Sequence, residues 1–198
     1  MLSLLTCICL AYISAVLSQD PTTICLPTAY YTNYTNLLTG DYGYILTDFG
    51  KELLVEISKT TNLRLVLDFK NLKSYEIKAN VCREARLPPS RIQTRCLPPY
   101  SKLIPTLSGY VGNAQVSYGA VYVQTWEVAT EFDIVYRESF TVQSGQPYWL
   151  TMSQELGYHG TNNIYVYTNP KAGAADLWAF QIPPTCESED LGGPIVIG

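Results

Sequence analysis

Histidine and charged residues are scarce in this sequence, and their scarcity limits the chemistry it can support. The one histidine, His159, lies in the run Gly157-Tyr158-His159-Gly160, which is typical of a turn between strands. Any Ser-His-Asp or Cys-His site would have to use it, and no Gly-x-Ser-x-Gly elbow occurs. We therefore expect no catalytic residues, and a binding protein rather than an enzyme.

Motifs for phosphate, sugar and nucleic-acid chemistry are missing as well. The chain has no glycine-rich phosphate loop, and its net charge of −4 gives no electrostatic basis for binding nucleic acid. Glu131 and Asp133 stand two residues apart, as on the polar face of a strand, and do not indicate a glycosidase pair.

Residues 1–18 have no charged side chain and are almost entirely apolar, with small residues before a cleavage point at Ser18. This pattern predicts a secretory signal peptide, and hence a secreted, extracellular protein. A membrane helix needs about 20 apolar residues. The polar residue Gln19 follows too soon, and no later stretch is long enough to span a bilayer.

Four of the six cysteines remain after the signal, because Cys7 and Cys9 belong to it. Four cysteines in a secreted chain predict two disulfides, with three pairings open from counting alone. Their spacings match no zinc site. The four are Cys25, Cys82, Cys96 and Cys186.

The chain beyond the signal, about 180 residues, is long enough for one domain with a hydrophobic core. Its composition, 47% hydrophobic and 15% charged, is that of a globular protein. We expect one domain over residues 19–186 and a flexible tail over 187–198. Asn33-Tyr34-Thr35 is a glycosylation sequon, in a polar, tyrosine-rich stretch that we expect to be a loop.

Most of the domain shows the period-two alternation of strands that have one polar face. Asn71 marks a hairpin turn between the two clearest runs. Helical signals are few, the best being residues 171–178. The pattern predicts one antiparallel β domain of about eight to ten strands in two layers. The predicted strands are 53–57, 63–69, 75–81, 121–128, 132–140 and 164–168.

Three stretches resemble the ependymin-related family of secreted proteins. The first, residues 75–83, runs into Cys82 and is followed by a proline-rich loop. The second is Gly109-Tyr110-Val111-Gly112 with Val123-Gln124-Thr125-Trp126, similar to a Val-Gln-x-Trp strand of the family. The third, residues 176–186, is similar to the family's terminal segment that ends in Pro-x-x-Cys. The order and spacing of the three carry the resemblance over residues 75–186.

Two departures from the family pattern concern the N-terminal cysteine. Cys25 is followed by Tyr30 where the family has a Trp-x-Gly start, and the family's cysteine before a proline is missing before Pro147. The resemblance implies a disulfide between Cys82 and Cys186. Because the usual partner of Cys25 is missing, that residue is left to pair with Cys96.

The resemblance implies a mainly β fold similar to bacterial lipoprotein carriers. Two stacked, curved antiparallel sheets would form a half-open barrel around an apolar cavity, with one or two short helices. Family members are secreted, often glycosylated, often dimeric and calcium-associated, and are thought to hold lipids. For this chain it implies a bound lipid, polyisoprenoid or carotenoid, a glycan on Asn33, and calcium, although Asp41 and Asp48 belong to no known calcium loop.

Alternating apolar and aromatic residues are suited to line such a cavity, and sixteen tyrosines would offer hydroxyls to the polar ends of a ligand. The alternatives are that these residues only fill the core, and that the protein is an adhesion or matrix glycoprotein without a small ligand. The predicted wall consists of Leu65, Leu67, Tyr75, Ile77, Tyr122, Trp126, Phe132, Ile134, Tyr136 and Trp149.

Two of the predicted strands, 53–57 and 164–168, are apolar or aromatic on both faces. A sheet buries one face against its own core, so the second apolar face needs a cover. Together with the habit of the family, this predicts a homodimer, or a dimer with a close relative. The alternative is that residues 87–105 or 171–178 cover that face instead.

Overall fold

The alternating sequence folds into β-strands almost throughout. The structure, a computed structural model, describes residues 19–79, 81–89, 92–112, 120–129, 134–142, 148–157, 160–173, 177–184 and 186–188. The predicted signal peptide lies outside the described residues, and so do residues 189–198 of the predicted tail. No helix within the described part of the chain is long and apolar enough to cross a membrane.

The regular elements are thirteen strands and short 3₁₀ helices, counted over the described ranges. The helices are η1 (Pro21–Thr23), η3 (Pro105–Leu107) and η4 (Leu177–Phe180). The strands are β1 (Ala29–Asn36), β2 (Tyr42–Asp48), β3 (Leu53–Ser58), β4 (Leu63–Asp68), β5 (Lys73–Lys78), β6 (Val81–Arg86), β7 (Lys102–Leu103), β8 (Gly109–Gly112), β9 (Ala120–Ala129), β10 (Val135–Thr141), β11 (Leu150–Gly157), β12 (Gly160–Ala172) and β13 (Glu187–Ser188).

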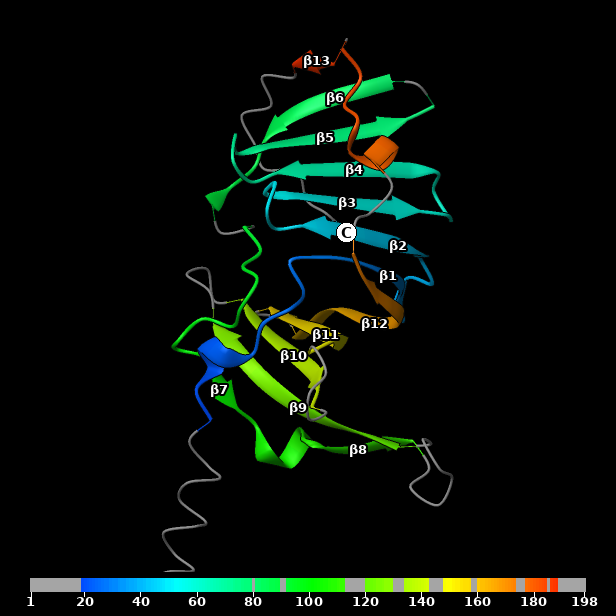
Figure 1. Ribbon diagram of the computed structural model, residues 1–198. Coiled ribbons are helices and arrows are strands. Elements are labelled where there is room, and N and C mark those ends of the chain that lie inside the picture. The colour runs from blue at the N-terminus through cyan, green and yellow to red at the C-terminus, as the bar shows by residue number, and fades with distance from the viewer. Residues whose placement is uncertain are drawn as a thin grey trace, which may run out of the picture.

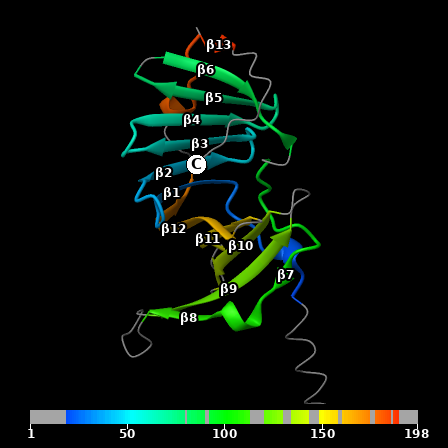
Figure 2. The ribbon, with the colours of Figure 1, turned by 180° about the vertical axis from the view of Figure 1, so that it is seen from behind.

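All of these strands belong to one sheet, in the order β13-β6-β5-β4-β3-β2-β1-β12-β11-β10-β9-β7, with β8 also paired to β9. The pairing is antiparallel except that β13 runs parallel to β6. Strand β1 pairs with β2 on one side and β12 on the other, and so joins an upper half, β1–β6, to a lower half, β9–β12 (Figure 1). Figure 2 shows the same succession from behind.

The mainly β, antiparallel architecture expected from the sequence is confirmed, but the arrangement of sheets differs from the expectation. Instead of two separate stacked sheets, one continuous sheet runs through the described residues. The reason is the pairing of β1 with both neighbours, which leaves no break between the halves. The two end strands, β13 and β7, do not pair with each other, so the sheet is not closed into a barrel.

The predicted strands 53–57, 63–69 and 121–128 are confirmed as β3, β4 and β9, and Asn71 lies in the turn between β4 and β5. The predicted strand 75–81 is wrong as a single element. Strand β5 ends at Lys78 and β6 begins at Val81, with Ala79 at a φ of 49°. A positive φ at a residue other than glycine leaves no turn signal in the sequence.

Two other expectations about local structure also fail. Lys171 and Ala172 belong to β12, so the helix predicted over 171–178 does not begin there, and the 3₁₀ helix η4 starts only at Leu177. Asn33 lies in the middle of β1 and not in a loop. Its half-buried side chain accepts a hydrogen bond from the Tyr31 hydroxyl. Whether Asn33 carries a glycan stays a prediction.

The upper half of the sheet buries both of its faces. On the outer face, a core that includes Val55, Val66 and Tyr75 packs against the C-terminal segment, residues 177–186, whose η4 lies in front of the strands in Figure 1. Arg64 fastens this segment, because its Nη1 donates to the backbone oxygens of Trp178 and Ala179 at 3.3 and 3.2 Å. The chain thus covers the outer face of β3 itself, but mainly with residues that follow the predicted cover 171–178.

The inner face carries the other two clusters of buried side chains. Their members alternate along each strand with those of the outer face, as period-two geometry requires. The upper cluster is Leu54, Leu65, Leu67, Phe69 and Leu87. The lower cluster is Ile24, Leu26, Tyr30, Leu97, Trp126, Phe140 and Leu150.

Both predicted disulfides are present. Cys82 is joined to Cys186 and Cys25 to Cys96, over sequence separations of 104 and 71 residues. The first bond ties the C-terminal segment to β6, and the second ties the segment 92–100 to the N-terminal residues that precede β1. Two disulfides indicate an oxidising compartment.

Replacing both Cys82 and Cys186 by serine is expected to lower the free energy of unfolding by about 2–5 kcal/mol, because a loop of this length is no longer closed in the unfolded chain. Denaturant unfolding measures the loss. Limited proteolysis should then cut residues 177–186 before any strand, since only the Arg64 hydrogen bonds and the packing on the outer-face core would hold the segment. The double variant of Cys25 and Cys96 serves as the control, and its C-terminal segment should stay protected. Unchanged protection in the first variant would contradict this role.

Candidate functional site

The inner face bounds a cavity of about 340 Å³, which lies between strands of the upper and the lower half. Pockets that bind small molecules have volumes of about 300–1,000 Å³. The cavity is lined from β2–β4 and β9–β12 and by the segment 92–100, which the Cys25–Cys96 disulfide holds in place. Its lining is Leu26, Ile45, Leu54, Glu56, Leu67, Phe69, residues 92–98, Tyr100, Val128, Tyr136, Glu138, Phe140, Leu150, Ser153, Glu155, Asn163, Tyr165 and Tyr167.

The strand register explains why residues distant in the sequence meet in this lining. One row across the sheet runs from Trp126 to Glu138, Ser153, Tyr165 and Asn36, each on the strand next to the one before. The next row runs through Val128, Tyr136, Glu155 and Asn163. Because side chains at paired positions share a face, each row presents its polar and aromatic groups to the same side.

The upper part of the lining is mostly apolar, with Ile45, Leu54, Leu67 and Phe69 from β2–β4 and the loop that follows β4. The lower part mixes aromatic rings with carboxyl groups. Tyr165 and Tyr167 lie on β12 with ring centroids 6.4 Å apart, and the Tyr167 hydroxyl is 2.9 Å from Ser153 Oγ. The cavity is therefore amphipathic, with an apolar wall above and a polar aromatic wall below.

Glu138 is the most perturbed carboxyl group of the cavity. Burial raises its pKa to about 7, because the surrounding protein disfavours the charged form. Among the described residues it has no hydrogen-bond or ion-pair partner, and its remaining exposed surface faces the cavity. A carboxylate of this kind is costly when ionised. Glu138 therefore exchanges its proton near neutral pH.

Glu56 reaches the cavity from β3 and belongs to a hydrogen-bonded group with Tyr34 and Asp41. The Tyr34 hydroxyl donates to Asp41 Oδ2 at 3.0 Å and is also within hydrogen-bonding reach of Glu56. A hydroxyl has one proton, so Tyr34 can donate to only one of the two carboxylates. Burial raises the pKa of Glu56 and of Tyr34, and the group is most easily satisfied when Glu56 holds a proton.

The third carboxyl group, Glu155 on β11, is held by amides of β12. Asn163 Nδ2 donates to Glu155 Oε2 at 3.4 Å, and Asn36 Nδ2 donates to Asn163 Oδ1 at 2.9 Å. Asn36 is on β1, so this chain of amides also crosses the junction between the halves. It gives Glu155 a defined position, in contrast to Glu138.

Of the predicted wall, Leu67 and Tyr136 line the cavity, and Leu65 is buried on the same face as Leu67. Tyr75 and Ile77 were misplaced: they lie on the outer face, under the C-terminal segment. Alternation separates two faces but does not say which one bounds a cavity, and here both are covered. Phe132 lies outside the described residues, and so does His159.

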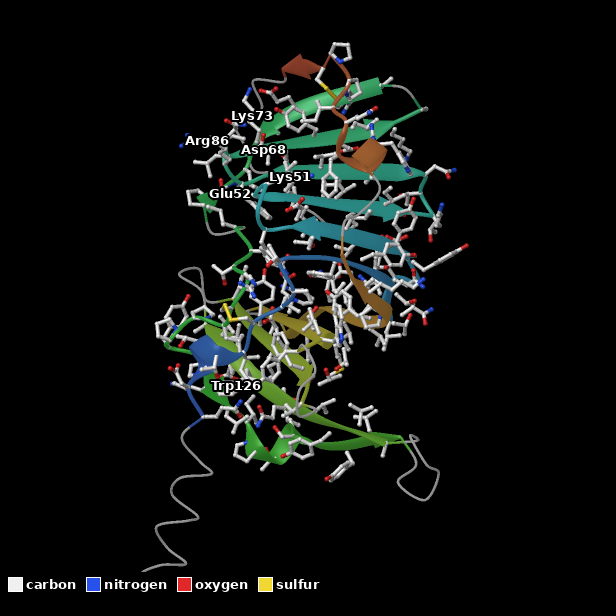
Figure 3. The ribbon with its side chains drawn as sticks, viewed as in Figure 1. Lys51, Glu52, Asp68, Lys73, Arg86 and Trp126 are labelled. Carbon is white, nitrogen blue, oxygen red and sulfur yellow. A yellow bond between two sulfur atoms is a disulfide. The ribbon has the colours of Figure 1, made fainter. Side chains whose placement is uncertain are left out.

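The remaining predicted wall residues do not line the cavity. Trp126, labelled on β9 in Figure 3, is 2% exposed and packs in the lower inner cluster, with Trp149 against it. Tyr122 is at the far end of β9, beside Tyr110. Ile134 precedes β10. Trp126 is thus a core residue here, which was the alternative considered for every aromatic.

The carboxyl groups of the cavity were missed from the sequence. The signal that would have found them is an acidic residue in phase with the apolar residues of its strand, as Glu56 is with Leu54 and Glu138 with Phe140. Within the described ranges no group of three histidine, cysteine or acidic residues is close enough to hold a metal ion.

No protein-family model matches the chain, and no curated protein does. Its fold is similar to the crystal structure of an uncharacterized conserved protein from Thermus thermophilus, with a TM-score of 0.54 and 10% sequence identity. The match covers 85% of this chain and 94% of that one. The likeness shows a shared antiparallel β fold and says nothing about a ligand.

Replacing Glu138 by glutamine should stabilise the protein at alkaline pH. The folded-state pKa of about 7 lies above the ordinary value of 4.5, so the contribution of Glu138 to stability is greatest below pH 4.5 and falls as pH rises to 7. The variant avoids this loss and should gain about 1–3 kcal/mol at pH 8, and almost nothing at pH 4. Urea unfolding at both pH values measures the difference.

The matched control is Glu127→Gln on the opposite face of β9. Glu127 Oε2 lies 3.3 Å from Arg137 Nε, in a half-exposed ion pair. Loss of this pair should cost under about 1 kcal/mol, and with the opposite sign. A Glu138→Gln variant that is no more stable than wild type at pH 8 would show that the carboxylate finds a partner.

Proposed function

We propose that this protein is a secreted carrier that holds a hydrophobic small molecule on the inner face of its sheet. The observation that carries the proposal is the cavity itself, about 340 Å³ in volume, with an apolar wall from β2–β4. A cavity of this size costs stability unless something fills it, because its lining lacks contacts. Small-molecule sites typically combine apolar and aromatic walls with polar groups that orient the ligand, and this cavity has both.

Membership of the ependymin-related family is part of the same proposal. It is supported by the two disulfides, one of which joins the residues that the family pattern joins, Cys82 and Cys186. It is also supported by the mainly β sheet with a cavity on one face. The disulfides and the signal-like residues 1–18 support an extracellular location.

Among the ligands considered from the sequence, a single-chain lipid suits the cavity best. The volume lies near the lower end of the range for small-molecule pockets. That favours a molecule with one flexible chain over a long, rigid carotenoid. Tyr100, which is 62% exposed, and Ile92, 39% exposed, both belong to the lining and mark its opening to solvent.

The test is mass spectrometry of an organic extract of the protein, secreted from eukaryotic cells and purified without detergent, together with its absorption spectrum. We expect about one ligand per chain, without visible colour. Val128→Trp fills the cavity from β9 and should reduce the bound ligand several-fold. Glu127→Trp, the neighbouring position on the outer face, should leave it unchanged.

An extract with no stoichiometric lipid, from protein that also takes up none when lipids are added, would refute the carrier function. The adhesion or matrix role would then be the better account. It would have support in exposed apolar residues of β8 and β9: Tyr110, 74% exposed, on one face, and Val111 and Val121, 62% and 38% exposed, on the other.

These exposed residues are the basis for retaining the dimer as a proposal, as a homodimer or with a close relative. Light scattering should give about twice the mass of one chain, which is 22.1 kDa with residues 1–18 included. Tyr110→Asp should produce monomers, whereas Leu38→Asp, at another exposed apolar position, in the β1–β2 turn, should not. A wild-type mass of one chain would exclude the dimer.

A further inference from the structure

The cavity is lined by hydrogen-bond acceptors that receive no hydrogen bond from the described residues. Glu138 has no hydrogen-bond or ion-pair partner among the described residues. Gln93, in the segment 92–100, also lines the cavity, and its Oε1 is buried with no partner within the described part of the chain. Buried acceptors are normally satisfied by a donor. Two unsatisfied acceptors, on separate elements of one lining, point to a ligand that donates hydrogen bonds.

Charge selects the same kind of ligand. Three carboxyl groups line the cavity, Glu56, Glu138 and Glu155, against one cation, Arg95. Arg95 is exposed, and its Nε already donates to the Leu26 backbone oxygen at 2.8 Å. A fatty acid would add a fourth carboxylate to this set, at a cost in like-charge repulsion. A cationic headgroup would reduce the repulsion among the three carboxylates.

Aromatic rings complete the complementarity. Tyr136, Tyr165 and Tyr167 line the cavity on the same side as Glu138 and Glu155. The faces of tyrosine rings attract cations within about 6 Å, more strongly when water is excluded. Tyr165 and Tyr167 are stacked with an interplanar angle of 23°, so their rings present neighbouring surfaces.

We propose that the ligand is a cationic amphiphile, with a single hydrocarbon chain against Leu54, Leu67 and Phe69 and a protonated amine beside Glu138. This rests on the proposed carrier function and names its ligand class. The ammonium donates the hydrogen bonds that Glu138 and Gln93 lack, and it offsets the carboxylates that face it.

Binding of the amine should weaken as pH falls, because the ammonium favours ionised Glu138 and protonation removes its partner. The other titratable groups that face the cavity are Glu56 on β3, Arg95 in the segment 92–100, Glu155 on β11, Tyr136 on β10, and Tyr165 and Tyr167 on β12. Burial raises the pKa of Tyr165 and of Tyr167, so both stay uncharged between pH 5.5 and 8. Burial also raises the pKa of Glu56, so protonation of Glu56 weakens amine binding as pH falls, as protonation of Glu138 does.

The test compares three probes of equal chain length, tetradecylamine, tetradecanoic acid and tetradecanol, by calorimetry on delipidated full-length protein. At pH 8 we expect the amine to bind at least about tenfold more tightly than either of the others. Its affinity should fall about tenfold at pH 5.5, while that of the alcohol stays the same.

Variants separate the headgroup site from the apolar wall. Glu138→Gln should weaken the amine about tenfold and leave the alcohol within about twofold, whereas Glu127→Gln should change neither. If the acid or the alcohol binds as tightly as the amine, the carrier function stands and the amine headgroup is wrong. If none of the three binds and the native extract is empty, the carrier function itself fails. The wild-type comparison decides even if a variant does not fold.

Discussion

The pairing of β1 with β12 is the interaction on which the rest of the structure depends. Strand β1 is the first long strand of the chain and β12 the last, and their ladder is the only link between the two halves of the sheet in the described residues. The cavity takes its apolar wall from one half and its carboxyl groups and tyrosines mostly from the other. Without this ladder, each half would be an open sheet with an uncovered inner face.

Hydrogen bonds between side chains and across the strands reinforce the ladder where polar residues of β1 and β12 are buried. Asn36 on β1 donates to Asn163 on β12, and the Thr32 hydroxyl bonds to the backbone oxygen of Thr168. Tyr34 and Tyr165 make an edge-to-face contact across the same junction, with centroids 6.0 Å apart. Buried polar bonds of this kind specify one register, because a slip by one residue would leave each of them unmade.

The sequence predicted the strands that alternate cleanly and failed where tyrosine dominates. In β4, Leu65 and Leu67 differ plainly from Arg64, and the strand was found. Strand β1 was read as a loop, because a tyrosine has both an apolar ring and a hydroxyl and so carries no alternation signal. The disulfide pairs came from the family resemblance, since four cysteines alone leave three pairings open.

The candidate site was predicted less well than the fold, for a reason that lies in the packing. The alternation correctly assigned Leu67 and Val66 to opposite faces of β4, but both faces are buried. Leu67 lies beside the cavity, and Val66 lies under residues 177–186. Tyr75 was therefore assigned to the wrong side. The carboxyl groups were not predicted to line the cavity, because a lone acidic residue in a strand ordinarily faces solvent. Only the register, which sets Glu138 beside Ser153 and Trp126, shows that it faces inward.

The junction of β1 and β12 also fixes the order of events during biosynthesis. Thr32 and Thr168 are 136 residues apart, so the pairing must wait until nearly the whole chain has left the ribosome. Strands β1–β6 form a succession of hairpins that can fold earlier, from contacts between neighbours in the sequence. The strand that completes the inner face, β12, is thus also the last long strand to be translated. The cavity on the inner face therefore exists only once synthesis of the chain is nearly complete.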